Sequence, residues 1–152
     1  MPAGAVAVKR EVHDAIVNGP AGGIEFFHGY TYSAHPLAAA AILATLDVYR
    51  REDLFARARK LSGAFQEAAH SLKGAPHVID VRNLGLVAGV ELAPRDGAPG
   101  ARAAEVFQRC FDSGLMVRYT GDIIAVSPPL IIDEAQIGQI FEQIGKVLKE
   151  VA

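Results

Sequence analysis

Residues 29–36 read GYTYSAHP and open directly onto an alanine-rich apolar segment. A glycine, hydroxyl side chains and a proline in this order predict a loop that leads into the first turn of a helix. The first backbone N–H groups of a helix have no partner within it, and together with the helix dipole they favour an anion such as a phosphate. Thr31 and Ser33 would add hydroxyl donors. The same residue types also form ordinary helix caps, so the pattern leaves a plain Ser or Thr cap open beside a phosphate site.

The other reactive residue types do not assemble into a second site. His28 and His35 flank the loop, but no cysteine or suitably spaced carboxylate accompanies them, and we expect no metal site. Ser33, His35 and Asp47 could be combined into a hydrolase triad, yet no G-x-S-x-G turn presents the serine. Nucleotide-binding motifs of the G-x-G-x-x-G or P-loop kind are also absent from the sequence.

Composition describes a globular chain of 152 residues, 51% hydrophobic and 21% charged, with a net charge of -2. The near-neutral balance argues against nucleic acid or an anionic membrane as a partner. No apolar run approaches the ~20 residues that span a bilayer. Cys110 is the only cysteine and lies between Phe107 and Phe111, so we expect a buried thiol and a reducing, cytoplasmic location.

The first third of the chain is expected to hold a strand and two helices. Residues 1–8 are apolar and small, which predicts a strand that needs cover on both faces. Helical spacing follows at Val12, Ile16 and Val17, and a longer alanine-rich helix is expected from Pro36 to residue 48. The polar joint at residues 50–53 predicts a domain boundary between residues 1–49 and 50–152.

The rest of the chain predicts an α+β fold. Apolar periodicity indicates helices over residues 54–72, 103–111 and 133–151, the last opened by a capping box of Asp133 and Gln136. Alternation indicates strands over residues 78–82, 86–92, 115–119 and 123–126. Paired strands interleaved with helices favour an antiparallel or mixed sheet with helices on one face.

Residues 28–36, HGYTYSAHP, resemble the HG-(F/Y)-T-(Y/F)-S-(G/A)-H-P segment of the class III aminotransferases, which are pyridoxal-phosphate (PLP) enzymes of fold type I. Residues 78–86 (VIDVRNLGL) and 117–122 (VRYTGD) continue the likeness in order, and they are most similar to the β-alanine (ω-amino acid):pyruvate transaminases. The resemblance implies an α/β enzyme overall. Residues 1–49 would be a remnant of its large PLP-binding domain and residues 50–152 its small C-terminal domain.

The resemblance also implies roles for individual residues. Thr31, with the backbone of Tyr30 and Thr31, would contact the phosphate of the PLP held by a neighbouring subunit. Arg118 would pair with the substrate carboxylate, for which a guanidinium fork is well suited. Without the resemblance, Arg118 is a solvated surface charge. Arg82 is expected to be structural.

In this family the Schiff-base lysine lies a little upstream of the segment equivalent to residues 4–8, and the present sequence begins at Met1. We therefore expect part of a self-associating transaminase that moves an amino group from an ω-amino acid or amine, β-alanine-like, to pyruvate. This chain alone would be inactive and would not hold PLP covalently. An aminomutase or a decarboxylating transaminase fits residues 117–122 less well. The rival hypothesis is a non-catalytic, stand-alone α+β interaction module from a truncated or split gene.

Overall fold

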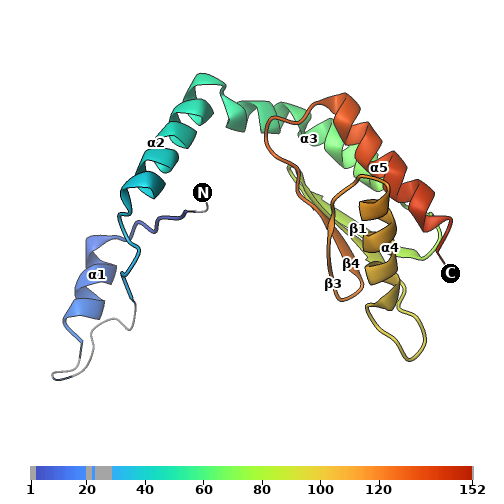
Figure 1. The fold of residues 1–152 in the computed structure, drawn as a ribbon, viewed down its shortest axis with the longest axis horizontal. Coiled ribbons are helices and arrows are strands. Elements are labelled where there is room, and N and C mark those ends of the chain that lie inside the picture. Colours follow the sequence, from blue (N-terminus) through green and yellow to red (C-terminus); the bar gives the residue numbers. More distant parts are fainter. Residues whose placement is uncertain (1–2, 20–21, 23–28, 152) are drawn as a thin grey trace. The chain divides into compact units, whose positions relative to one another are not determined.

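The computed structural model describes residues 3–19, 22 and 29–151. The chain divides into two compact units, Met1–Glu52 and Asp53–Ala152. The first unit contains helices α1 (Arg10–Val17) and α2 (Pro36–Arg51), with Pro36 in the first turn of α2 as the sequence predicts (Figure 1). No residue of either helix is buried.

The strand expected over residues 1–8 is wrong for the part that the structure describes. Residues 3–9 form no strand, and residues 1–2 lie outside the described chain. A strand requires a neighbour to accept its backbone hydrogen bonds. The described part of the first unit cannot supply that neighbour, because its regular elements are the two helices α1 and α2.

The second unit follows the expected order of helix, two strands, helix, two strands and helix. Its elements are α3 (Leu54–His70), β1 (Val78–Leu84), β2 (Val87–Leu92), α4 (Ala101–Asp112), β3 (Arg118–Thr120), β4 (Ile123–Val126) and α5 (Glu134–Leu148) (Figure 1). All pairings are antiparallel, in the strand order β1-β2-β4-β3. The expected α+β fold is confirmed, with an antiparallel rather than a mixed sheet.

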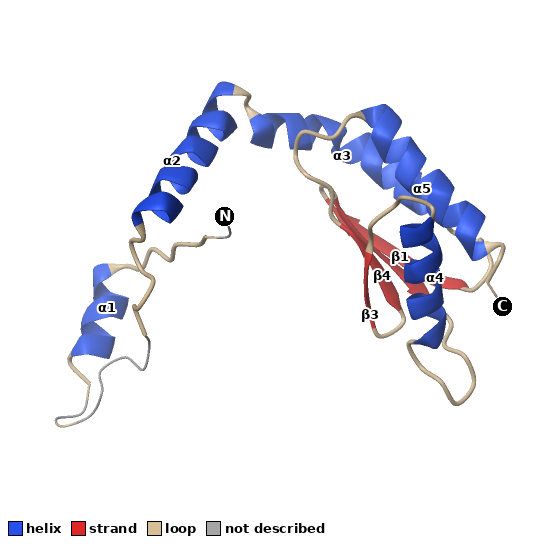
Figure 2. Ribbon diagram, viewed as in Figure 1, coloured by secondary structure: helices blue, strands red, loops and turns tan. Residues whose placement is uncertain are grey.

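The three helices of this unit cover one face of the sheet (Figure 2). Alternate residues of β2 and of the position before it point into the core, where Leu86, Ala88, Val90 and Leu92 are buried. Val87 on the same strand is exposed, because side chains of a strand alternate between its two faces. The opposite face of the sheet is therefore left open in this unit.

Two details of the expected helices and strands differ. Phe55 and Phe111 belong to the expected apolar stripes, but their side chains are 63% and 56% exposed. β3 begins at Arg118 instead of residue 115, because the backbone N–H of Leu115 donates to the Cys110 carbonyl at 2.8 Å and Gly114 turns the chain with a φ of 86°. Gly114 and Leu115 thus form the turn that closes the C-terminus of α4, where a left-handed glycine is typical.

Other local expectations are confirmed. The Asp133 carboxylate accepts the Gln136 N–H at 2.8 Å, and the Gln136 side chain accepts the Asp133 N–H at 3.1 Å, which completes the capping box of α5. Cys110 is fully buried, and this burial raises the pKa of its thiol to about 11. Among the described residues, none of the helices combines the length and the apolar character that crossing a membrane requires.

Candidate functional site

The loop before α2 forms a tight turn. The N–H of Ser33 donates to the Tyr30 carbonyl at 2.9 Å, and the N–H of His35 donates to the Tyr32 carbonyl at 3.4 Å. His35 is the N-cap residue of α2 and makes no side-chain cap. The Thr31 hydroxyl makes no hydrogen bond to the part of the chain that the structure describes. The geometry thus gives no support to a plain hydroxyl cap.

An open cavity of about 810 Å³ lies against this turn and the start of α2. Its lining includes Thr31, Ser33, His35 and Ala38. The N–H of Ala39 is the first in α2 that donates to the N-cap carbonyl, at 2.9 Å. Pro36 has no N–H, so the donors left without a partner in the helix are the N–H groups of Leu37 and Ala38. The first turn of α2 carries no acidic residue, and none of the described residues that line the cavity has a carboxylate. This arrangement suits the phosphate end of an anionic ligand.

Arg118 lies on β3, in the other unit. It pairs with Ala125 of β4, and Ala125 in turn pairs with Gly89 of β2, so small residues lie next to Arg118 across the sheet. The Arg118 side chain is exposed and has no hydrogen-bond or ion-pair partner among the described residues. A guanidinium in this state has all its donors available for a carboxylate.

Arg82 is in a different state. Its Nη1 lies 2.7 Å from a carboxylate oxygen of Asp80 and 2.7 Å from one of Glu91. Hydrogen bonds to Glu91 and to Asp80 raise the pKa of Arg82 further. The structural role expected for Arg82 agrees with this cross-strand cluster.

The structure does not bring together the residues of the hydrolase triad. His35 and Asp47 are twelve residues apart along one helix, a separation of roughly 18 Å at 1.5 Å per residue, and Asp47 pairs with Arg50 instead. Within residues 3–19, 22 and 29–151, no group of three metal-ligating side chains forms. His28 lies outside the described residues. The hydrolase triad is therefore excluded.

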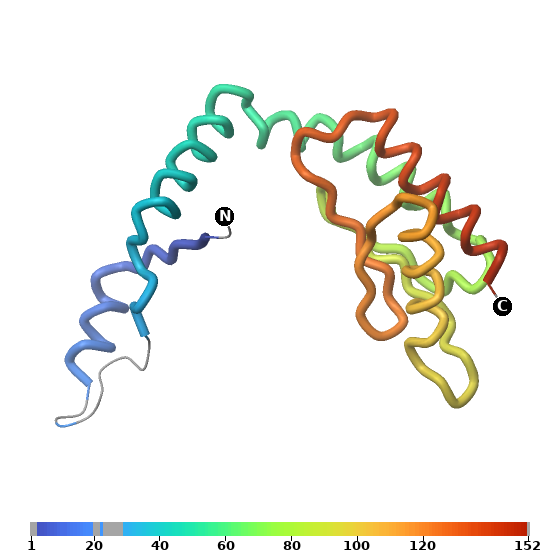
Figure 3. The backbone as a smooth tube through the Cα atoms, in the orientation of Figure 1, coloured from blue at the N-terminus to red at the C-terminus, as the bar shows by residue number. Residues whose placement is uncertain are grey.

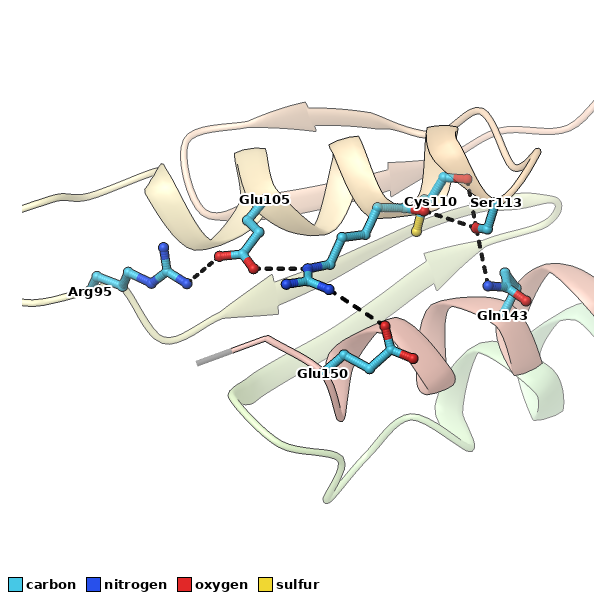
Figure 4. Close-up of polar contacts among 7 residues, drawn as sticks. Arg95, Glu105, Cys110, Ser113, Gln143 and Glu150 are labelled. Atoms are coloured by element: carbon cyan, nitrogen blue, oxygen red, sulfur yellow. Dashed lines mark hydrogen bonds and ion pairs between the residues drawn. The ribbon is translucent and has the colours of Figure 1, made fainter.

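Sequence reasoning missed two groups of polar contacts. The first is an ion-pair chain in which Glu105 contacts Arg95 at 2.5 Å and Arg109 at 2.8 Å, and Arg109 reaches Glu150 at 3.6 Å, with a neighbouring Ser113–Gln143 hydrogen bond (Figure 4). The second is the bond from the Gly100 N–H to the Asp122 carboxylate at 2.7 Å. Only the i,i+4 pair of Glu105 and Arg109 carries a sequence signal, because the other contacts join separate elements.

Comparison with known proteins gives a consistent set of relatives. The family model described as aminotransferase class-III matches residues 1–148. An omega-aminotransferase of Caulobacter vibrioides is 61% identical over 151 residues, 99% of this chain and 34% of that protein. A beta-alanine–pyruvate aminotransferase of Pseudomonas aeruginosa is 38% identical over 154 residues, 100% of this chain and 34% of that protein.

Solved structures agree with these relatives. The crystal structure of a thermostable omega transaminase mutant from Pseudomonas jessenii superposes with a TM-score of 0.75 and 31% identity, over 82% of this chain and 29% of that one. The present chain thus spans about a third of the length of the proteins that it matches.

Proposed function

The chain belongs to the class III aminotransferases, and from this membership we propose that it is part of a PLP-dependent transaminase that moves an amino group from an ω-amino acid or amine to pyruvate. The names of its relatives support this donor and acceptor, because they are an omega-aminotransferase and a beta-alanine–pyruvate aminotransferase. In this proposal residues 1–49 complete a large PLP-binding domain and residues 50–152 form the small domain. β-Alanine is the donor that we assign first.

The loop before α2 is proposed to hold the phosphate of PLP through Thr31 and the backbone of Tyr30 and Thr31. Support comes from the Thr31 hydroxyl, which has no partner in the described chain, and from the N–H groups of Leu37 and Ala38 at the start of α2. The described residues that line the cavity also include no carboxylate. When bound, PLP supplies the electron sink for the reaction, and the protein supplies binding and orientation. The resemblance assigns that PLP to a neighbouring subunit, so we also propose a homodimer or a larger homo-oligomer.

Arg118 is proposed to bind the carboxylate of the amino donor. A planar guanidinium binds both carboxylate oxygens at once and so fixes the direction of the substrate as well as its charge. The single observation that carries this role is that Arg118 is exposed on the open face of the sheet without a partner in the described chain, whereas Arg82 on the same face is already paired.

The chain alone is proposed to be inactive. Its lysines, Lys9, Lys60, Lys73, Lys146 and Lys149, are all exposed. A lysine that forms a Schiff base is instead activated by its surroundings, for example by desolvation in a hydrophobic pocket, and exposed lysines lack such a pocket.

Borohydride reduction tests this inactivity. After incubation with PLP and reduction, we expect peptide mapping to show scattered, substoichiometric labelling and no turnover of β-alanine with pyruvate. One stoichiometrically labelled lysine together with turnover would contradict the proposal.

A further inference from the structure

The β3–β4 hairpin that carries Arg118 has little support of its own. β3 is an edge strand of three residues, and Thr120 pairs with Ile123, which leaves Gly121 and Asp122 as the two-residue turn. Gly121 has a φ of 55°, a left-handed conformation that glycine adopts without strain. Because β3 and β4 share so few residue pairs, contacts outside the hairpin must fix the direction in which it points.

Asp122 makes two such contacts from the turn. Its carboxylate Oδ1 accepts the backbone N–H of Gly100 at 2.7 Å, and its backbone carbonyl accepts the N–H of Leu92 at 2.9 Å. Gly100 is the N-cap residue of α4, with a φ of 81°, and an added Cβ there would lie 3.5 Å from the Gly121 carbonyl oxygen. The trace in Figure 3 places the hairpin, in orange, beside the yellow loop that leads into α4.

The start of α4 lacks a cap of its own. Its N-cap residue has no side chain, and its first turn carries no acidic residue. The Asp122 carboxylate, which comes from the β3–β4 turn, therefore serves as the cap of α4. At the start of a helix, the free N–H and the helix dipole both favour a negative charge. A second contact also joins the hairpin to α4: the centre of the Tyr119 ring lies 5.3 Å from that of the Phe107 ring.

We infer that Asp122 is a positioning residue for the carboxylate-binding Arg118, and this inference rests on the function proposed for Arg118. Alternation along β3 places Tyr119 on the helix-covered face and Arg118 on the open face. No described side chain holds the guanidinium, so its reach is set by the backbone that the Asp122–Gly100 bond fixes to α4. Misplacing such a group weakens recognition of a carboxylate-bearing donor and leaves a donor without a carboxylate unaffected.

Amide hydrogen exchange on the chain itself tests the contact. Asp122→Ala removes the acceptor, so we expect the Gly100 amide and the amides of β3 to exchange on the order of 10-fold faster. Asp122→Asn keeps an acceptor oxygen at the same place and should restore most of the protection. Asp96→Ala is the matched control, an exposed aspartate in the loop before α4 with no partner in the described chain. Unchanged exchange of the Gly100 amide, or of β3, in Asp122→Ala would overturn the inference.

Donor kinetics test the consequence. The enzyme is a chimera in which this chain replaces the matching third of the Caulobacter omega-aminotransferase. We expect Asp122→Ala to raise the KM for β-alanine about 10-fold in its half-reaction, with kcat nearly unchanged and a carboxylate-free amine little affected. Asp122→Asn should recover most of the loss, and Asp96→Ala should lose none.

Arg118→Ala separates the two possible failures. If it weakens both donors equally, the function proposed for Arg118 is wrong, whatever Asp122 does. If it weakens only the carboxylate donor while Asp122→Ala weakens neither donor or both alike, Arg118 keeps its function and the positioning role of Asp122 is wrong.

Discussion

Thr31 and Arg118 each present side-chain donors that no group in the described part of the chain accepts. The lack of a protein partner costs a hydroxyl or a guanidinium little free energy while it is in water, because water accepts its hydrogen bonds. In the proposed function, a phosphate at Thr31 and a carboxylate at Arg118 would replace that water and accept these donors.

Thr31→Ala in the chimera is expected to weaken PLP binding. A hydrogen bond to a charged group contributes about 1.5–3 kcal/mol, so the Kd should rise roughly 10- to 150-fold. Fluorescence titration of the apo-chimera with PLP measures this change. Thr45→Ala is the matched control, because its hydroxyl donates to the Ala41 carbonyl within α2, at 2.8 Å. Equal losses for the two variants would assign Thr31 to the stability of the helix instead of to the phosphate.

Arg118→Ala is expected to lower kcat/KM for β-alanine by about 2–5 kcal/mol, or roughly 30-fold to several-thousand-fold, because it breaks a desolvated charge pair. A donor without a carboxylate should lose little. Arg118→Lys should recover only part, since an ammonium cannot form the two-point fork.

Half-reactions are needed for this comparison, because the acceptor pyruvate also carries a carboxylate and would hide the contrast in overall turnover. Arg82→Ala is a useful second variant, because the paired Arg82 should not discriminate between the donors.

Between elements, the ion pairs around Glu105 join α4 to the preceding loop and to the end of the chain. Hydrogen bonds from Arg95 and then from Arg109 lower the pKa of Glu105 below its ordinary value of 4.5. A carboxylate with a lowered folded pKa stabilises the fold above its unfolded pKa, and this contribution is lost as the pH falls through the folded pKa.

Glu105→Gln should therefore flatten the acid side of the stability profile. We expect the urea midpoint of the native chain to fall more steeply than that of the variant as the pH drops below 4.5. Glu142→Gln is the comparison, because Lys146 of the same helix lowers the pKa of Glu142, and Glu142 has no partner on another element of the described chain. Parallel profiles for Glu105→Gln and the native chain would contradict the role assigned to this cluster.

Local chemistry explains which elements were predictable. The capping box of α5 and the alternation along β2 depend only on residues that are close in the sequence, so the sequence predicts both. The start of β3 was misplaced because Leu115 still bonds to α4, and residues 3–9 form no strand because the described first unit holds only helices as regular elements. The Asp122–Gly100 bond joins positions 22 residues apart, and no periodic pattern marks such a pair.

At the scale of the whole molecule, the first unit exposes large apolar side chains, and contiguous apolar patches on soluble proteins usually mark sites of association. Val6 is 90% exposed and Leu43 is 64% exposed, and no residue of α1 or α2 is buried. We expect the 16.1 kDa chain to self-associate in light scattering, and Leu43→Glu to reduce that association. A monomer whose residues 3–19 and 29–49 are fully protected from exchange would contradict this expectation.

Turnover by the chimera with the Caulobacter enzyme bears most directly on the claim that this chain is a functional third of a transaminase. If the chain supplies the phosphate and carboxylate contacts, the chimera should transfer the amino group of β-alanine to pyruvate, while the 152-residue chain alone should show none. The chimera should also lose its preference for carboxylate-bearing donors when Arg118 is replaced by alanine. A folded, PLP-loaded chimera without turnover would contradict the proposed function and favour a non-catalytic α+β module.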